Sequence, residues 1–407
     1  MQSSPGNGAS TKVGFEFIAM IALMMGITAL SIDIMLPALP AIEAHYNLDD
    51  INDQQLVIVS YMVGFGFGQL IFGPFSDRYG RKPVLVFGMI CYMAATVVAV
   101  TGFEFNTHLT GRLLQGVAAG AARVIAVAIV RDRFAGRSMA RVMSFVMMIF
   151  ILVPVVAPAM GAGILLVGPW QWMFWFLLIV AVLLIVWVWF RLVETRPKED
   201  RTPLTVRTFA SAVATTLSNR QTLCYAVTVS FTFAPLLAYI AASQQIFVGI
   251  YQLDNLFPLA FGGVALFTVA ASLTNARLVP KLGMRRLSHS ALLLMLGLSL
   301  IIAAFAWFGH PPLFVLLAFL ALSMFAVGLC FPNFNALAME PHGAIAGTAS
   351  SIVGFTSTAI GATIGWAIGD AFDGTILPLT LGFAACAAGS IIAILIAEPQ
   401  RFLKKTV

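Results

Sequence analysis

Residues 73–82 read Gly-Pro-Phe-Ser-Asp-Arg-Tyr-Gly-Arg-Lys and lie between two long apolar runs of the chain. The stretch holds four charged side chains: Asp77, Arg78, Arg81 and Lys82. Charges at this density cannot lie in hydrocarbon, where each one is costly. The stretch is therefore predicted to be a short loop at a membrane surface that joins two helices, both of which span the bilayer.

The composition also indicates a membrane protein. Hydrophobic residues make up 60% of the 407 residues and charged residues only 10%, whereas a soluble domain carries roughly a quarter. The cations behind the net charge of +6 sit in short loops between apolar runs, so no nucleic-acid partner is expected. The four cysteines lie in apolar segments without CxxC spacing and the five histidines show no metal-ligand spacing, so neither disulfides nor a metal site are predicted.

A spanning helix needs about 20 mostly apolar residues. Twelve segments of the sequence meet this requirement, at roughly 14–38, 54–75, 83–101, 108–130, 139–167, 170–192, 221–246, 256–279, 287–308, 313–338, 345–371 and 376–397. No GxxxxGK[ST] loop and no Ser/His/Asp constellation accompanies them, which disfavours both an ATP-driven pump and an enzyme.

Lysine and arginine give the orientation, because cytoplasmic loops carry an excess of both. They occupy the loops after the second, fourth, sixth and eighth spans and are absent from the loops after odd-numbered spans, several of which hold acidic residues instead. Both termini are therefore predicted to be cytoplasmic. The longest polar stretch lies near the midpoint, so we expect an N-terminal six-helix half at 1–192, a cytoplasmic linker at 193–220 and a C-terminal six-helix half at 221–407.

A faint internal repeat supports two related halves. When residues 77–82 are aligned with residues 280–285, Arg78 matches Lys281, Gly80 matches Gly283 and Lys82 matches Arg285. Both segments lie between the second and third span of their half. Repeated halves around a central site are the design of many secondary transporters.

Several motifs resemble one family. The pattern Gly-x-x-x-Asp-Arg-x-Gly-Arg-Lys at 73–82 resembles the signature loop between helices 2 and 3 of the major facilitator superfamily. Arg112-Leu-Leu-Gln-Gly116 resembles another motif of the superfamily, and Trp170-Gln-Trp-Met-Phe174 is similar to a segment of its drug/proton antiporters. Two further segments, Asp33-Ile-Met-Leu-Pro37 and Ala338-Met-Glu-Pro341, resemble those of the Bcr/CflA branch of these antiporters. The resemblance covers the whole chain.

The resemblance implies an all-α membrane protein with twelve transmembrane helices in two six-helix pseudo-repeats, the major facilitator fold. It implies a multidrug efflux transporter of the bacterial inner membrane, which exports hydrophobic antibiotics such as phenicols or bicyclomycin by alternating access. The inward flow of protons would drive export without a cofactor, and we expect a monomer. The alternative is a proton-coupled exporter of a cellular metabolite, such as a nucleoside, sugar or amino-acid derivative.

Two side chains inside the first-half spans are candidates for proton coupling. Asp33 lies in the first span, and burial away from water favours the protonated form of a carboxylate. In the family the arginine of the fourth span is tied to proton coupling, and that role is carried over to Arg112. The two residues are expected at a similar depth, where a contact between them is feasible. Asp33 could instead pair permanently with an arginine and only order the bundle, and it could bind proton, substrate or both.

The resemblance places helices 1, 4, 7 and 10 around the transport path, so polar and adaptable side chains on them are candidates for a substrate cavity. The candidates are Met24, Gln115, Arg123, Tyr239, Gln244, Asn333 and Asn335. Arg123 could bind a polar drug group, pair with an acid or extend to the cytoplasmic surface. For each aromatic residue or methionine, the alternative is a purely structural role, in which it packs against the core or the lipid.

The charged stretch at 73–82 is a candidate gate. Its residues Asp77, Arg78, Gly80, Arg81 and Lys82 are predicted to act with Asp132. Arg81 can pair with Asp132, and Asp77 can sit at the start of the eleventh span, where the helix dipole favours an anion. The alternative is a turn that only satisfies the positive-inside rule. Pro154, Pro158 and Gly161 of the fifth span are expected to bend or pack it, and the glycines at 64–68 should permit close helix contact.

Overall fold

The computed structural model of the protein describes residues 14–134, 136–201, 213–216, 218–254, 256–341, 346–401 and 403. All regular elements in these ranges are helical. Eleven helical segments are long and apolar enough to cross a membrane, and α6 (Gly136–Val167), with its apolar part at Leu152–Val167, is the twelfth long helix. The prediction of an all-α membrane protein with twelve spans is confirmed.

The spans follow the predicted order, and several are longer than their apolar cores. The other long helices are α1 (Phe15–Asp33), α3 (Leu56–Tyr79), α4 (Arg81–Thr101), α5 (Phe105–Arg133), α7 (Gln171–Arg191), α9 (Arg220–Gln244), α10 (Phe257–Leu282), α11 (Met284–Trp307), α12 (Leu313–Met339), α13 (Ala346–Asp370) and α14 (Leu377–Ala397). The short elements are η1 (Leu36–Ala38), α2 (Leu39–Tyr46), η2 (Ile51–Gln55), η3 (Lys198–Asp200), the π-helix η4 (Gln245–Ile250) and η5 (Pro399–Arg401).

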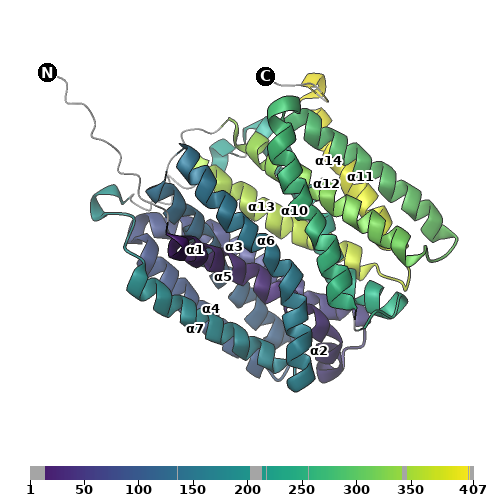
Figure 1. Ribbon diagram of the computed structural model, residues 1–407, viewed down its shortest axis with the longest axis horizontal. Helices are drawn as coiled ribbons and strands as arrows, with labels where there is room; N and C mark the ends of the chain where they lie inside the picture. The colour runs from purple at the N-terminus through teal and green to yellow at the C-terminus, as the bar shows by residue number, and fades with distance from the viewer. Residues whose placement is uncertain are drawn as a thin grey trace.

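Figure 1 shows the helices from the first part of the chain, purple to teal, beside those from the last part, green to yellow. Two helix pairs make the most extensive contacts between these groups: α3 packs against α13, and α6 packs against α10. The predicted boundaries of two halves and a linker stay a prediction, and residues 202–212 and 217 of that linker lie outside the described residues.

The stretch that was predicted to be a charged loop is almost entirely helical. Helix α3 continues to Tyr79, so Asp77 and Arg78 lie in its last turn, and α4 begins at Arg81. Gly80 alone connects the helices, with φ of 102°, a left-handed conformation that glycine adopts without a steric penalty. The same construction recurs later in the chain, where Gly283, with φ of 81°, connects α10 to α11. This agrees with the pairing of Gly80 with Gly283 in the sequence.

Helices α3 and α5 approach each other closely through glycines on both sides. A Cβ atom at Gly64 would lie 2.0 Å from the carbonyl oxygen of Leu113, and one at Gly116 would lie 1.9 Å from that of Tyr61. Backbone cannot move aside as a flexible side chain can, so only glycine permits this approach. The close contact expected from the glycines at 64–68 is therefore observed, and it fixes the depth of α5 relative to α3.

We expect Gly116→Ala to destabilise the protein, because its methyl group must push α5 away from Tyr61; overpacking of this kind costs about 1–3 kcal/mol. Gly297 in α11 is the matched control, since a Cβ atom there would meet nothing within 4 Å. Gly297→Ala should leave stability unchanged or raise it by up to about 1 kcal/mol. Thermal unfolding of both purified variants in detergent measures the difference, and equal melting temperatures would contradict the close approach.

Candidate functional site

The first span is interrupted at Asp33. Helix α1 ends there, Ile34 and Met35 form a turn, and the chain continues through η1, which contains Pro37. The side chain of Asp33 is only 2% exposed. Irregular backbone at membrane depth is tolerated where protein covers it, and Gly161 of α6 provides this cover, since a Cβ atom there would lie 2.2 Å from the Ile34 carbonyl oxygen. The sequence thus places a carboxyl group at a break in a spanning helix.

Arg112 is fully buried and holds three helices together. Its Nε donates to the carbonyl oxygen of Val57 on α3 at 2.9 Å, and its Nη2 donates to that of Ser31 on α1 at 3.1 Å. Its Nη1 donates to Oε1 of Gln115 at 2.6 Å, and the guanidinium lies 4.6 Å from the ring centroid of Tyr61. The guanidinium group of Arg112 therefore donates its hydrogen bonds to uncharged carbonyl and amide oxygens.

The contact that we expected between Asp33 and Arg112 does not form. No ion pair or hydrogen bond joins Asp33 to another of the described residues, whereas the guanidinium of Arg112 is directed to Ser31, two residues earlier in α1. Positions two apart on a helix face nearly opposite sides, so a side chain that reaches the Ser31 carbonyl does not reach the Asp33 carboxyl. The similar depth of the two residues was predictable from the sequence. It was not predictable that Arg112 contacts the side of α1 opposite to the Asp33 side chain.

Two cavity candidates of the first half lie in packed interfaces. Gln115 is fully buried, and its Nε2 donates to Oγ1 of Thr96 on α4 at 2.8 Å while its Oε1 accepts from Arg112. Met24 is also fully buried in the apolar core. In this arrangement both residues connect helices rather than line an open space. Arg123 is partly exposed on α5, and its role stays a prediction.

The second-half candidates occupy three different places. Tyr239 stacks on Phe261 at 5.1 Å and donates to its carbonyl oxygen at 3.1 Å. Asn333 donates to Oδ1 of Asn275 on α10 at 2.7 Å, and Asn335 donates to a carbonyl of its own helix. Gln244 alone of the seven candidates lines one of the described cavities. Tyr239 and Asn333 thus tie α9 and α12 to α10.

The gate residues form a compact ionic cluster around Arg81, which is 1% exposed. Its Nε contacts Oδ2 of Asp132, at the end of α5, at 2.9 Å, and its Nη2 contacts Oδ1 of Asp77 at 2.8 Å. Its Nη1 donates to Oγ of Ser76 at 2.6 Å. The structure therefore brings together three of the predicted gate residues. The expected approach of Asp77 to the start of the eleventh span, α13, stays a prediction.

The remaining gate residues lie at the edge of this cluster. Arg78 is exposed, with its guanidinium 5.3 Å from the ring centroid of Tyr79. Lys82 donates from Nζ to the carbonyl oxygen of Trp189 at 2.7 Å. Glu194, which sequence reasoning did not assign to the gate, accepts hydrogen bonds from the backbone N–H groups of Arg81 and Lys82 at 2.9 and 3.1 Å. A carboxylate at a helix start satisfies free N–H groups and complements the dipole of α4.

The second half contains a counterpart of this cluster. Arg285 is 1% exposed near the start of α11, and it pairs with Glu340, directly after α12, at 2.9 Å and with Glu398, directly after α14, at 2.8 Å. In the first half Asp132 and Glu194 hold the equivalent places at the end of α5 and after α7. The sequence repeat aligned Lys82 with Arg285, but in three dimensions Arg81 is the buried equivalent. Arg81 directly follows Gly80, whereas Arg285 is the second residue after Gly283, so an alignment without gaps does not pair the two arginines.

At the opposite ends of the helices, uncharged side chains connect the two groups of helices. The Nδ2 of Asn52 donates to the carbonyl oxygens of Asp370 and Phe372 at 2.9 and 3.2 Å. The Nε2 of Gln55 donates to Oε1 of Gln245 at 2.7 Å, and the Nε2 of Gln245 donates to Oδ1 of Asn52 at 2.8 Å. We call the side chains of Asn52, Gln55 and Gln245 the amide latch. The only sequence signal for it was the polar run at 52–55 before the second span.

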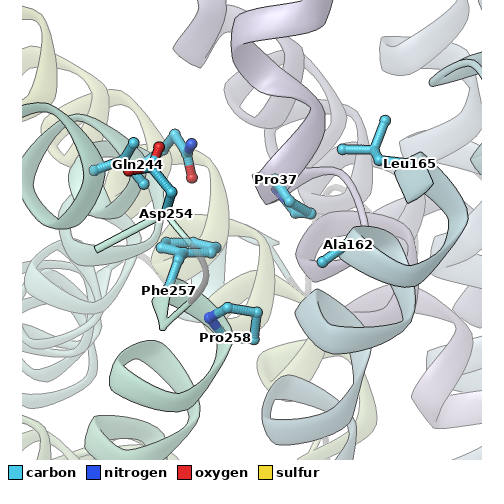
Figure 2. A pocket seen from close by; sticks show the side chains of 8 residues that line it. Pro37, Ala162, Leu165, Gln244, Asp254, Phe257 and Pro258 are labelled. Carbon is cyan, nitrogen blue, oxygen red and sulfur yellow. The ribbon is translucent and has the colours of Figure 1, made fainter. Parts of the chain in front are cut away.

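A cavity of about 200 Å³ lies beside the amide latch. Figure 2 shows Pro37, Ala162 and Leu165 on one side of it and Gln244, Asp254, Phe257 and Pro258 on the other. The two sides belong to different groups of helices, because η1 and α6 supply the first wall and α9 and α10 border the second. The cavity therefore depends on how the two groups are placed relative to each other.

We expect Arg81→Lys to destabilise the protein by about 1–3 kcal/mol, because an ammonium group cannot meet Ser76, Asp77 and Asp132 together and leaves buried acceptors unsatisfied. Arg78→Lys is the matched control, since Arg78 is an exposed arginine in the last turn of α3 and the same substitution there should leave stability nearly unchanged. Thermal unfolding compares the two variants, and a melting temperature of Arg81→Lys equal to that of Arg78→Lys would contradict the role of the fork.

Comparison with known proteins identifies the family. The chain matches the family model described as Major Facilitator Superfamily over residues 21–366. It is 30% identical over 390 residues to the bicyclomycin resistance protein homolog of Haemophilus influenzae, a match that covers 94% of this chain and 96% of that protein. It is 26% identical over 342 residues to multidrug resistance protein D of Escherichia coli K12, a match that covers 83% and 84% of the two chains.

Solved structures agree on the fold. A D-xylose-proton symporter superposes with a TM-score of 0.74 at 14% identity, over 96% of this chain and 98% of its own. The human organic anion transporter MFSD10 superposes with a TM-score of 0.70 at 19% identity, over 94% and 99%. At these identities the likeness shows the fold alone. The chain therefore belongs to the major facilitator superfamily and, within it, groups with relatives of the Bcr/CflA type, as its motifs predicted.

Proposed function

We propose that the protein is a proton-coupled exporter of hydrophobic drugs, with antibiotics such as phenicols or bicyclomycin as its substrates. It acts as a monomeric transporter rather than an enzyme, in the bacterial inner membrane, with both termini in the cytoplasm. The proton gradient replaces a cofactor. The names of the bicyclomycin and multidrug resistance relatives support the substrate class.

The observation that carries the proposal is the carboxyl group of Asp33 at the break in α1. It is buried, and no cationic group of the described residues pairs with it. A buried charge without a partner is costly, so a proton on Asp33 stabilises this arrangement. A conformation that admits water to the break would favour the ionised form. Uptake and release of one proton can thus be tied to the change of conformation.

One end of the helix bundle offers a contact between the two groups that such a change must break, whereas the contacts of the ionic cluster at the other end lie within the first group. The ionic cluster around Arg81 lies at the end that carries the lysines and arginines, which the positive-inside rule assigns to the cytoplasm. The amide latch lies at the opposite end and joins α3 to α13 and η4. With the latch closed, the outer ends of the two groups of helices are held together. Alternating access would open the latch when the cytoplasmic ends close.

We expect Asp33→Asn to lose uphill export while the variant still folds, because the neutral amide resembles the protonated carboxyl but cannot release a proton. Asp49→Asn is the control, since Asp49 is an exposed carboxylate. Export of chloramphenicol, measured in inside-out vesicles with an imposed pH gradient, should fall by about tenfold or more in Asp33→Asn, the equivalent of roughly 1.4 kcal/mol. It should stay at the wild-type level in Asp49→Asn. The amount of protein and its melting temperature are measured in parallel.

Uphill transport by Asp33→Asn at the wild-type rate would remove Asp33 from proton coupling. If the wild-type protein moves no drug from a panel of antibiotics but releases a metabolite when it is expressed, the alternative of a metabolite exporter replaces the drug proposal. Transport that does not respond to the pH gradient would refute proton coupling for either substrate.

Arg112→Ala should impair both export and stability more than Arg112→Lys does. The alanine leaves the acceptors on Ser31, Val57 and Gln115 without their donor, whereas a lysine restores part of this set. Arg131→Ala, at an exposed position of the same helix, is the control and should resemble the wild type. Vesicle export and thermal unfolding are measured for all three. Equal loss in the two Arg112 variants would make the fork geometry irrelevant, and no loss in either would refute the coupling role.

A further inference from the structure

The cavity beside the amide latch contains a buried acceptor that is not used. The side chain of Gln244 is 8% exposed, lines the cavity, and its Oε1 has no hydrogen-bond partner among the described residues. An unsatisfied buried acceptor is unfavourable, because it has lost its water without gaining a donor. A molecule that brings a hydrogen-bond donor to this oxygen therefore recovers free energy that the protein alone does not.

The backbone at this point is also unusual. Helix α9 ends at Gln244, and the π-helix η4 begins at Gln245. π-Helical turns are rare and are found frequently at functional sites. Here the two neighbouring glutamines serve different partners: Gln245 donates to Asn52 within the amide latch, while Gln244 lines the cavity. The change of helix type thus accompanies a side chain that lines the cavity.

The charge of the surroundings favours a cation. Asp254 lines the cavity and is exposed, so a carboxylate lies where the cavity meets solvent. The connecting segments at this face hold several acidic residues and no lysine or arginine. A face with charges of one sign concentrates ions of the other sign. The free oxygen of Gln244 and the carboxylate of Asp254 both accept hydrogen bonds, so the complementary ligand carries N–H donors and a positive charge.

The rest of the lining is apolar and sets the size of the ligand. Pro37 and Leu165 face Phe257 and Pro258 across the cavity (Figure 2). The volume of about 200 Å³ is below the roughly 300–1,000 Å³ of pockets that enclose drug-sized ligands. The cavity therefore accommodates an apolar group with an attached amine, rather than a whole large drug.

We infer that this cavity is a binding site for amphipathic organic cations at the outer end of the transport path, with Gln244 and Asp254 as the residues that recognise the protonated amine. The role of this site in export rests on the proposed function, whereas the binding of the cation does not. Because its walls belong to both groups of helices, a bound cation holds the outer ends in their present arrangement and opposes the opening of the amide latch.

The test uses 4-phenylbutylamine as the probe and 4-phenylbutanol as its neutral counterpart. Their Kd values are measured by calorimetry on the full-length protein in nanodiscs of zwitterionic lipid, with empty nanodiscs subtracted. The wild type should bind the amine at least tenfold more tightly than the alcohol. Gln244→Met, which removes the acceptor at similar size, should weaken amine binding at least tenfold, and Asp254→Asn should weaken it several-fold and reduce the preference for the amine.

Asp373→Asn is the matched control, because Asp373 is an exposed carboxylate at the same face that does not line the cavity. It should leave both Kd values unchanged. Unchanged amine binding in Gln244→Met and Asp254→Asn would overturn the assignment, and so would equal binding of amine and alcohol by the wild type. A melting temperature for each variant identifies any loss of binding that comes from misfolding.

A second measurement locates the probe without removing a polar group. In Ala162→Cys a thiol is placed on the wall opposite Gln244, and peptide-resolved mass spectrometry follows its reaction with a maleimide. The amine should slow this reaction at least fivefold and leave the native cysteines unaffected, whereas absence of protection would overturn the site. If drugs are exported but the amine does not bind here, only this inference fails. If the amine binds here but no drug is exported, the proposed function fails and the site stands.

Discussion

A charge that is removed from water inside a helical bundle must be matched by a partner or neutralised by a proton, and four buried residues of the structure illustrate this constraint. Arg81 and Arg285 meet carboxylates at the helix ends. Arg112 meets backbone and amide oxygens of three helices. Asp33 has no such partner among the described residues. A proton on Asp33 would complete the match at these four residues, and this would connect the architecture of the bundle to the proposed energy source.

The repeated architecture extends this constraint to both halves of the sequence. A single glycine with positive φ separates α3 from α4 and α10 from α11, and a buried arginine follows each glycine. Acidic residues near the ends of the neighbouring helices form ion pairs with these arginines or accept hydrogen bonds from their backbone N–H groups. The same local solution thus fixes one end of each group of helices. Close backbone contact between α3 and α5 adds to the packing of the first group.

The sequence was sufficient to predict the number of spans and the glycine packing, because each depends on local composition or on a motif of fixed spacing. The Arg81–Asp132 contact was predictable because the charged stretch resembles the signature loop of the family. The sequence could not predict which side of α1 faces Arg112, since that depends on how far each helix is rotated about its axis. The amide latch was missed for a related reason: Asn52 and Gln245 are far apart in sequence and meet only after α3, α9 and α13 have packed. Gln115 was placed in the cavity because its rotation toward Thr96 could not be foreseen.

The chemistry of the amide latch has a consequence for the environments in which the protein works. Its hydrogen bonds join uncharged amides to one another and to carbonyl groups, so neither acid nor salt changes the charge of any of its three side chains. The ionic cluster at the other end joins charged side chains instead. In the proposed orientation, the contact that meets the variable medium outside the cell is therefore made by groups whose charge does not depend on its acidity or ionic strength.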